Sequence, residues 1–227
     1  MEPSISLSER INVPNPQDFR TRTRILEAAG RVFAEKGFLQ ATSREICDLA
    51  QANTAAVNYY FGGKEQLYLE VLREADQRLV DRQAIQSILQ TGSNPEQMLE
   101  ELFRMVLHAL IGAESRSWYA RLLLREMTAP TGALAEVFEH RIRPNMMAFR
   151  QVVAGIMELP AEHLSVIRGA LSAMAQCLFV FQNRQMVELA IPEYQLDLAS
   201  VDQLAHHMTV FALGGFHAIA KETNTTE

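Results

Sequence analysis

Apolar residues recur along most of the chain every three or four positions, the spacing of one face of an α-helix, and no run alternates as a strand would. The first such pattern begins at Thr21 and predicts a helix that ends before Gly37, since glycine readily adopts the left-handed conformation of a helix terminus. Phe38 and Leu39 are expected to fold back onto the core. The apolar face of this helix consists of Ile25, Leu26, Ala29, Val32 and Phe33.

Two short helices are predicted next. Thr42 or Ser43 can cap the first of them, and Thr42 with Glu45 has the spacing of a capping box. Its expected buried positions are Ile46, Leu49 and Ala50. The chain then breaks, and Asn53 is a good cap for a helix over residues 54–60. Two short helices joined by a three-residue turn and braced by a preceding helix form the helix-turn-helix arrangement of DNA-binding proteins.

The rest of the chain is predicted to be helical as well, because Gly, Asn and Pro residues separate long stretches with helical periodicity. The expected helices cover about residues 64–82, 95–112, 114–128, 132–157, 161–190 and 200–221. A kink or break is expected before Pro144, and Ser200 is the expected cap of the last helix. The predicted fold class is therefore all-α, with an N-terminal three-helix helix-turn-helix domain and a larger C-terminal helical domain.

Composition and charge restrict the function. Hydrophobic residues make up 48% of the chain and charged residues 21%, which is ordinary for a globular protein. No signal peptide and no apolar run long enough to span a bilayer is recognised, so a cytoplasmic location is expected. The first 64 residues carry eight basic and seven acidic side chains, so within a net charge of −6 the remainder carries −7. Any DNA-binding surface is therefore expected to be local and N-terminal.

The two cysteines, Cys47 and Cys177, lie far apart in helical stretches, so reduced thiols are expected rather than a disulfide or a zinc site. No cofactor and no metal is expected. Catalysis is not expected either, because the chain has neither an H-E-x-x-H motif nor a nucleophile elbow nor a phosphate loop. His206 and His207 are adjacent and so point to different faces of a helix.

Residues 21–72 resemble the DNA-binding domain of TetR-family regulators. The resemblance rests on ILEAA at 25–29, FAEKGF at 33–38, ATSREI at 41–46 and YYFGGKEQL at 59–67, in this order and spacing. It implies a homodimeric transcriptional regulator, most simply a repressor that a small-molecule inducer releases from a palindromic DNA operator. On this basis, we assign residues 1–19 to a flexible arm, 20–66 to the helix-turn-helix domain and 67–227 to ligand binding and dimerisation.

The turn departs from the family pattern. Residues 50–53 read AQAN where the family usually has a small residue followed by Gly-Val-Ser, and Asn58 replaces an aromatic residue. These departures put the operator sequence in doubt rather than DNA binding itself. Residues 53–62, together with REM at 125–127 followed by Pro130, are similar to the CecR-type subgroup.

The expected DNA contacts lie at the starts of three successive helices. Hydroxyl groups and free N–H groups at a helix start suit phosphates, and small side chains allow close approach to thymine methyl groups. Lys64 resembles the family's phosphate-binding lysine. The expected contacts are Thr42, Ser43, Arg44, Asn53, Thr54, Ala55, Ala56, Asn58, Tyr59 and Lys64. Arg44 could instead be a solvated surface residue, as could Arg20, Arg22 and Arg24, whereas Tyr60 and Phe61 are expected to pack inward.

The central helices are expected to enclose a pocket for an apolar or amphipathic inducer, because methionine and aromatic residues suit such ligands. The candidates, each of which could instead be core, are Trp118, Tyr119, Leu122, Arg125, Met127, Phe138, Met146, Phe149, Phe179 and His217. Arg121 and Arg125 lie on one helical face and, if buried, would favour an anionic ligand group. Otherwise Arg125 is expected to pair with a carboxylate such as Glu126 of a second subunit or a neighbouring helix.

The last two long helices are the candidate dimer interface, and some of their apolar residues must instead belong to the subunit core. The candidates are Leu171, Met174, Leu178, Phe181, Met208, Phe211, Gly215 and Phe216. Gly214 and Gly215 are costly inside a helix, so a close helix approach is expected there. Two alternatives to a repressor remain open: an activator, and a TetR-like interaction module that does not bind DNA.

Overall fold

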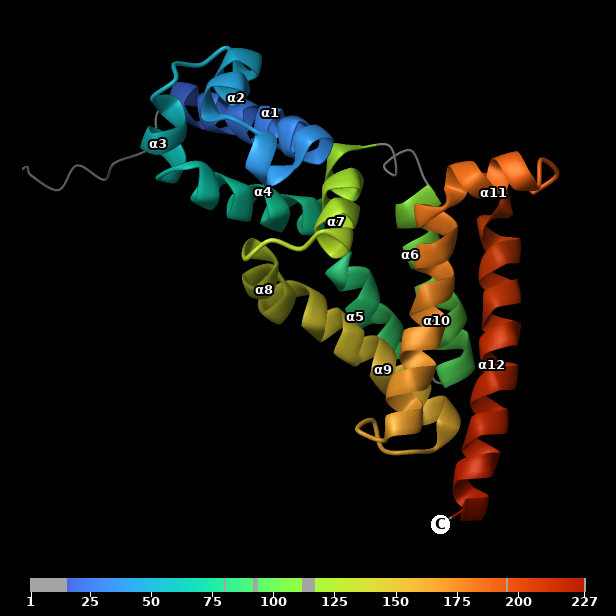
Figure 1. The fold of residues 1–227 in the computed structure, drawn as a ribbon. Coiled ribbons are helices and arrows are strands. Elements are labelled where there is room, and N and C mark those ends of the chain that lie inside the picture. Colours follow the sequence, from blue (N-terminus) through green and yellow to red (C-terminus); the bar gives the residue numbers. More distant parts are fainter. Residues whose placement is uncertain (1–15, 80, 92–93, 112–116, 195, 227) are drawn as a thin grey trace, which may run out of the picture. The chain divides into compact units, whose positions relative to one another are not determined.

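In the computed structural model, the described part of the chain consists of residues 16–79, 81–91, 94–111, 117–194 and 196–226. These residues form helices and turns with no strand among them, so the all-α fold class is confirmed (Figure 1). The chain divides into two compact units, Met1–Val71 and Leu72–Glu227. The predicted boundary after residue 66 lies shortly before this division, and α4 (Lys64–Leu79) continues from the first unit into the second.

The first helix, α1 (Pro16–Gln40), begins earlier than predicted. A proline at the start of a helix costs nothing, because its missing N–H would have no helical partner there. Residues 16–19 are therefore helical rather than part of the expected arm. Residues 1–15, the rest of that arm, lie outside the described residues.

Gly37 interrupts α1 with a φ of 77°, as predicted, and the chain then makes one more helical turn. Phe38 packs onto the ring of Tyr68 with centroids 5.0 Å apart, and Phe33 meets the same ring edge-on at 4.8 Å. The expectation that Leu39 folds back with Phe38 is wrong, since Leu39 is 89% exposed. The aromatic cluster anchors the start of α4 to α1.

The second helix, α2 (Ser43–Ala50), is capped as predicted, because Thr42 Oγ1 accepts the Glu45 N–H at 3.2 Å. The Glu45 carboxylate pairs with the ammonium group of Lys36. Ile46 is buried as expected, but Leu49 is 52% exposed, which corrects its assignment to the core. Helical geometry places Leu49 on the outer edge of this short helix.

The third helix, α3 (Ala56–Phe61), begins two residues later than predicted. Asn53 Oδ1 accepts the Ala55 N–H at 2.9 Å, and the Asn53 carbonyl accepts the Ala56 N–H at 2.8 Å. The expectation that Asn53 caps this helix is wrong, because Ala55 precedes α3; Asn53 instead bonds within the turn, to which Thr54 and Ala55 also belong.

Gln51 occupies the position where the resembled family has glycine, and its φ of 51° and ψ of 47° are left-handed. We expect Gln51→Gly to raise the free energy of unfolding by roughly 1 kcal/mol, because glycine adopts this conformation without a Cβ clash. Gln66→Gly, at an exposed position inside α4, is the matched control and should lower it by about 1 kcal/mol. Denaturant unfolding measures both changes, and a less stable Gln51→Gly protein would contradict the assignment.

The second unit begins with the end of α4 and is helical throughout its described residues. Its helices are α5 (Arg82–Thr91), α6 (Pro95–Ile111), α7 (Trp118–Thr128), α8 (Ala133–Val137), a π-helical segment (Phe138–Ile142), α9 (Arg143–Met157), α10 (Leu164–Gln182), α11 (Arg184–Ala190), a 3-10 turn (Leu198–Ser200) and α12 (Val201–Thr226). The start of α6 at Pro95 after the capping residue Asn94 is confirmed. Residues 112–116, where the next helix was expected to begin, lie outside the described residues.

Helix α5 was not predicted from the sequence. The helix predicted over residues 64–82 ends at Leu79, and α5 begins anew because Asp81 Oδ1 accepts the Ala84 N–H at 3.0 Å. The buried Asp76 carboxylate accepts a hydrogen bond from Arg82 Nη2 at 3.0 Å. This ion pair joins the end of α4 to the start of α5.

The predicted helix over residues 161–190 is in fact two helices. Helix α10 is capped by His163, whose Nδ1 accepts the Ser165 N–H at 3.2 Å, and it stops at Asn183 before α11. Asp197 caps the 3-10 turn Leu198–Ser200, and α12 begins directly after Ser200, the residue predicted to precede it. Asn183 and Asp197 are both residues whose side chains compete with helical hydrogen bonds, which is why the chain turns there.

The break predicted before Pro144 is confirmed, and it takes the form of the π-helical segment Phe138–Ile142. Proline has no N–H to donate to the preceding turn, so the α-helical hydrogen-bond pattern cannot pass through it. A π-helical turn absorbs this mismatch, and such turns occur frequently at functional sites.

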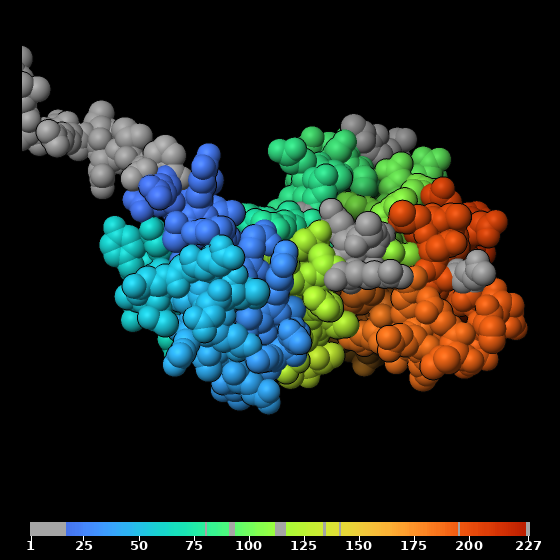
Figure 2. Space-filling view, turned by 90° about the horizontal axis from the view of Figure 1, so that it is seen from above, coloured from blue at the N-terminus to red at the C-terminus, as the bar shows by residue number. Residues whose placement is uncertain are grey.

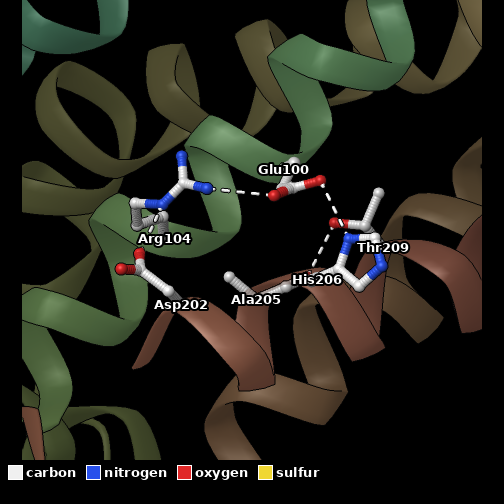
Figure 3. A network of polar contacts seen from close by, with 6 residues as sticks. All are labelled: Glu100, Arg104, Asp202, Ala205, His206 and Thr209. Carbon is white, nitrogen blue, oxygen red and sulfur yellow. Dashed lines mark hydrogen bonds and ion pairs between the residues drawn. The ribbon is translucent and has the colours of Figure 1, made fainter. Parts of the chain in front are cut away.

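The core of the second unit lies among α6, α9, α10 and α12 (Figure 1). On the rim, polar residues join α6 to α12 (Figure 3). Arg104 donates to Asp202 at 2.7 Å and to Glu100 at 2.9 Å, while His206 Nδ1 lies 3.4 Å from Glu100. These groups hold the two helices in register around their apolar contact.

The close helix approach inside the subunit occurs at Gly169 rather than at Gly214 and Gly215. A Cβ at Gly169 would lie 3.0 Å from the ring of Phe216, so α10 and α12 touch there. Gly214 and Gly215 have no described atom within 4 Å of a Cβ position. The close helix approach expected at these two glycines therefore does not occur within the described part of the subunit.

Helix α10 is long enough and apolar enough to cross a membrane by length and composition, contrary to the sequence-based expectation that no run qualifies. It packs against α9, α12 and α6, and core helices of soluble proteins meet the same criterion. Cys177 in α10 and Cys47 in α2 are buried and unpaired, as expected. Burial raises the pKa of the Cys177 thiol to about 12, so this thiol is unreactive.

Candidate DNA-binding surface and ligand cavity

Helix α3 displays one polar face to the surface of the first unit. Val57 and Phe61 are buried and hold the helix in place, while Asn58 and Tyr59 are exposed. Helices α2 and α3, light blue to cyan in Figure 2, lie at the surface of this unit. The face is therefore available to a large partner.

The turn before α3 contributes most of the remaining predicted contacts. Asn53, Thr54 and Ala55 are exposed, as a base- or phosphate-contacting turn requires. Ala56 is buried at 8% exposure, so its side chain packs against the core instead of facing outward. Ala56 is thus a support residue for the turn rather than a contact residue.

Lys64 binds the loop at the start of α2. Its ammonium group donates to the Ala41 carbonyl at 2.8 Å and lies 4.5 Å from the centre of the Phe38 ring. An ammonium group has three donors, so Lys64 can still donate to an anion. Because Ala41 immediately precedes Thr42, this arrangement brings a positive charge next to the free N–H groups at the start of α2.

Lys64 and the residues at the start of α2, Thr42, Ser43 and Arg44, form a basic region that is here called the cationic corner. Thr42 and Arg44 are exposed and Ser43 is half-buried. Arg44 lies 3.9 Å from Asp48 at an exposed position, where such a pair contributes little and can be exchanged for a phosphate contact. Thr42, Ser43, Arg44 and Lys64, predicted from separate helices, are therefore drawn into one region.

Two further predictions for this unit have mixed outcomes. The Arg22 side chain makes contacts within its own unit, because it forms an ion pair with Glu70 at 3.0 Å and lies over the Phe61 ring. Phe61 is buried as expected, but Tyr60 is only half-buried and donates its hydroxyl to Asp18 at 2.8 Å. This hydrogen bond raises the pKa of Tyr60 above its ordinary value.

The second unit has a surface cavity of about 250 Å³ between the π-helical segment, α9 and α10. It is lined by Phe138, Arg143, Met146, Met147, Phe149, Arg150, Ile167, Ala170, Leu171 and Met174. Three of the predicted pocket residues, Phe138, Met146 and Phe149, line it. Two residues predicted for the dimer interface, Leu171 and Met174, line it as well.

Most other predicted pocket residues lie elsewhere. Trp118 and Leu122 are buried in the core and Tyr119 is half-buried, whereas Arg125, Met127, Phe179 and His217 are exposed. None of these seven lines this cavity, so their assignment to a ligand pocket stays a prediction that this cavity does not support. His217 lies 3.7 Å from Glu96 instead.

Five lining residues were not predicted as pocket residues: Arg143, Met147, Arg150, Ile167 and Ala170. A signal was present in the sequence, because Arg143, Met147 and Arg150 recur at spacings of four and three on one face of α9. The arginines predicted for an anionic ligand group, Arg121 and Arg125, are both exposed. Glu126 is buried and accepts hydrogen bonds from the N–H and the hydroxyl of Thr131 in its own chain. The pairing of Arg125 with a carboxylate of a second subunit or a neighbouring helix stays a prediction.

The predicted dimer residues divide between core and surface. Met208 and Phe216 are buried in the subunit, and Met174 and Phe181 pack against its core. Leu178 is half-buried. Leu171 and Phe211 are 54% and 67% exposed, and Gly215 is exposed too. With Leu164, Val210 and Gly214, these exposed residues of α10 and α12 are here called the α10/α12 face.

No group of three His, Cys, Asp or Glu residues capable of holding a metal ion occurs among the described residues.

Residues 25–71 match the family model described as bacterial regulatory proteins of the TetR family. Residues 95–216, more than half of the chain, match the C-terminal domain of the HTH-type transcriptional dual regulator CecR. The chain belongs to the TetR family. Its CecR-like features are also confirmed.

Relatives and solved structures agree with this assignment. The transcriptional repressor NicS of Pseudomonas putida is 34% identical over 99 residues, which is 44% of this chain and 46% of NicS. The regulator BetI of Rhizobium meliloti is 24% identical over 172 residues, 75% of this chain and 81% of BetI. The structure of AibR with isovaleryl coenzyme A and operator DNA has a TM-score of 0.62 at 20% identity and covers 84% of this chain and 96% of AibR.

The match to NicS spans less than half of that relative's length, and the likeness to AibR concerns the fold. The matched families and these relatives are transcriptional regulators, which confirms the expectation that this TetR-family chain is a DNA-binding regulator and not an enzyme.

Proposed function

We propose that this chain is a cytoplasmic repressor that binds a palindromic operator as a homodimer and leaves it when a small-molecule inducer binds. The observation that carries the proposal is the position of Lys64, which holds the loop before α2 and places its charge beside Thr42. A phosphate at this corner fixes the register of the exposed turn and α3 on the DNA. The TetR family and the named repressors among the relatives of this chain support the proposal that it represses transcription.

Base reading is proposed for the turn and the outer face of α3. Thr54 and Ala55 present methyl groups that can meet thymine, and Asn58 can pair with adenine. Tyr59 and Asn53, both exposed, are proposed to contact phosphates on either side. The departure of Gln51 from the family's glycine leaves this geometry intact, because Gln51 adopts the left-handed conformation that glycine would adopt.

The dimer is proposed to form through the α10/α12 face. One short reading helix covers only a few base pairs, so a specific operator needs two of them at a fixed spacing. Gly214 and Gly215 lie open on this face, which allows a helix of the second subunit to approach closely. The subunit core alone leaves Phe211 and Leu171 without a partner surface.

The inducer is proposed to occupy the cavity beside the π-helical segment. Glu136, just before that segment, forms an ion pair with Arg73 of α4. Helix α4 begins at Lys64 in the DNA-binding unit. A ligand that favours another conformation of the π-helical segment therefore acts on the helix that carries the phosphate-binding lysine, and a coupling of about 1–3 kcal/mol lowers operator affinity 5- to 150-fold.

Selection of bound DNA from a random pool with the purified full-length protein tests this function. We expect a short near-palindrome whose binding weakens steeply as salt rises. A folded, dimeric protein that enriches no sequence would contradict the repressor function and favour an interaction module. Placement of the enriched site within promoters then separates a repressor from an activator.

Lys64→Gln tests the proposed phosphate contact itself. We expect weaker binding to all sequences alike and a salt slope smaller by about one, because one phosphate contact is lost. Lys221→Gln, at an exposed position on α12, is the control and should leave both quantities unchanged. An unchanged salt slope in the Lys64 variant would refute the phosphate contact.

A further inference from the structure

The cavity of the second unit carries one sign of charge. Its wall contains two arginines, Arg143 and Arg150, and no carboxylate, while the other eight lining residues are apolar. Arg143 is already paired, since its Nη1 lies 2.6 Å from Glu139 within the same helical stretch. Arg150 is therefore the cation that decides what the cavity accepts.

Arg150 is incompletely satisfied. Its side chain is only 20% exposed, and in the part of the chain that the structure describes its buried Nε has no hydrogen-bond partner. Its Nη2 lies 3.5 Å from Glu162, a carboxylate that is mostly in solvent and contributes little. A buried guanidinium N–H without a partner is costly, so an anion that accepts from it gains more than a surface contact would give.

The rest of the wall sets the shape of the ligand. Met146, Met147 and Met174 are flexible and polarizable, and Phe138 and Ile167 add rigid apolar surface. A volume of about 250 Å³ corresponds to roughly eight water-sized groups at about 30 Å³ each. This is below the roughly 300–1,000 Å³ range of pockets for drug-sized ligands.

We propose that this cavity binds a small anionic amphiphile, a monocarboxylate with an apolar body of about eight non-hydrogen atoms, whose carboxylate accepts hydrogen bonds from Arg150. The inference rests on the proposed function, because it names the chemical class of the inducer. Leu171 contributes both to the cavity wall and to the α10/α12 face, so a second subunit lies close to the bound ligand in the proposed dimer.

The test is calorimetric titration of the full-length protein with octanoate, octan-1-ol and octylamine at neutral pH. We expect saturable binding of octanoate, at least tenfold weaker binding of octanol, and the weakest binding of octylamine. Arg150→Gln should weaken octanoate binding about ten- to hundredfold and leave octanol binding unchanged, because the loss concerns the charged group alone. Arg150→Lys, which keeps the charge but not the planar fork, should fall between the two.

Arg168→Gln, an exposed arginine of α10 outside the cavity, is the matched control and should bind octanoate like the wild type. Met147→Trp places a large side chain at the cavity and should abolish binding while thermal unfolding remains cooperative. The proposal is overturned if octanoate does not bind the dimer, or if Arg150→Gln binds it as tightly as the wild type. Operator binding without ligand is measured in parallel, so octanoate binding to a protein with no operator would overturn the proposed function alone.

Discussion

Replacing Phe211 by aspartate is expected to convert the dimer into monomers and to lower operator affinity at least about a hundredfold. Phe211 belongs to the α10/α12 face and is 67% exposed, next to Val210 and close to Gly214 and Gly215 in the sequence. A carboxylate buried there in a dimer would have to lose its hydration without gaining a cationic partner. A monomer retains one reading helix, and the energy that separates specific from non-specific DNA binding depends on both.

Sedimentation and operator titration on the same samples measure these two changes. Met127→Asp, which introduces the same charge at an exposed apolar residue of α7, is the control and should remain dimeric with unchanged operator affinity. The subunit fold should survive in both variants, because neither side chain lies in the core. A Phe211→Asp protein that stays dimeric would place the interface on another surface.

The sequence predicted the first unit well because its signals are local. Thr42 caps α2, Gly37 and Gly62 take left-handed conformations, and Asn53 bonds within the turn, each through contacts within a few residues. The exceptions are residues such as Leu39 and Ala56, whose exposure depends on how a whole helix is rotated against its neighbours. Periodicity gives the apolar face of a long helix, but a helix of six or eight residues has too few positions to fix its rotation.

The second unit was harder to predict because its features depend on how several helices pack against one another. The break between α4 and α5 depends on Asp81 and on the Asp76–Arg82 ion pair, with no glycine or proline to mark it. The cavity exists only because α9, α10 and the π-helical segment leave space between them, which no single helix encodes. An aromatic residue such as Trp118 is attractive as a ligand contact in the sequence, yet the packing of the unit buries it in the core.

Arg73→Gln is expected to uncouple the ligand from the DNA while preserving binding of each. The Arg73–Glu136 ion pair is a side-chain link between α4 and α8, the helix that precedes the π-helical segment. Both side chains are about 40% exposed, so their loss should change the free energy of unfolding by less than about 1 kcal/mol. The coupling free energy, by contrast, depends on the link itself and should fall towards zero.

The measurement is the operator affinity with and without a saturating inducer, for which octanoate is used first. It is made on the wild type and on two single variants, Arg73→Gln and Glu136→Gln. In the wild type we expect a 5- to 150-fold loss of affinity on saturation, the range of typical allosteric couplings, and in Arg73→Gln or Glu136→Gln a loss of less than about threefold. By reciprocity, the operator should weaken inducer binding by the same factor in the wild type and not in the variants.

Two further proteins separate a specific link from general loosening. The reversed pair Arg73→Glu with Glu136→Arg restores opposite charges at the same positions and should recover most of the response. Arg104→Gln removes a different interhelical ion pair of the same unit, between α6 and α12 (Figure 3), and should leave the response intact. If Arg104→Gln uncouples the protein as strongly as Arg73→Gln does, the signal spreads through the rigidity of the whole helical unit rather than through Glu136 and α4.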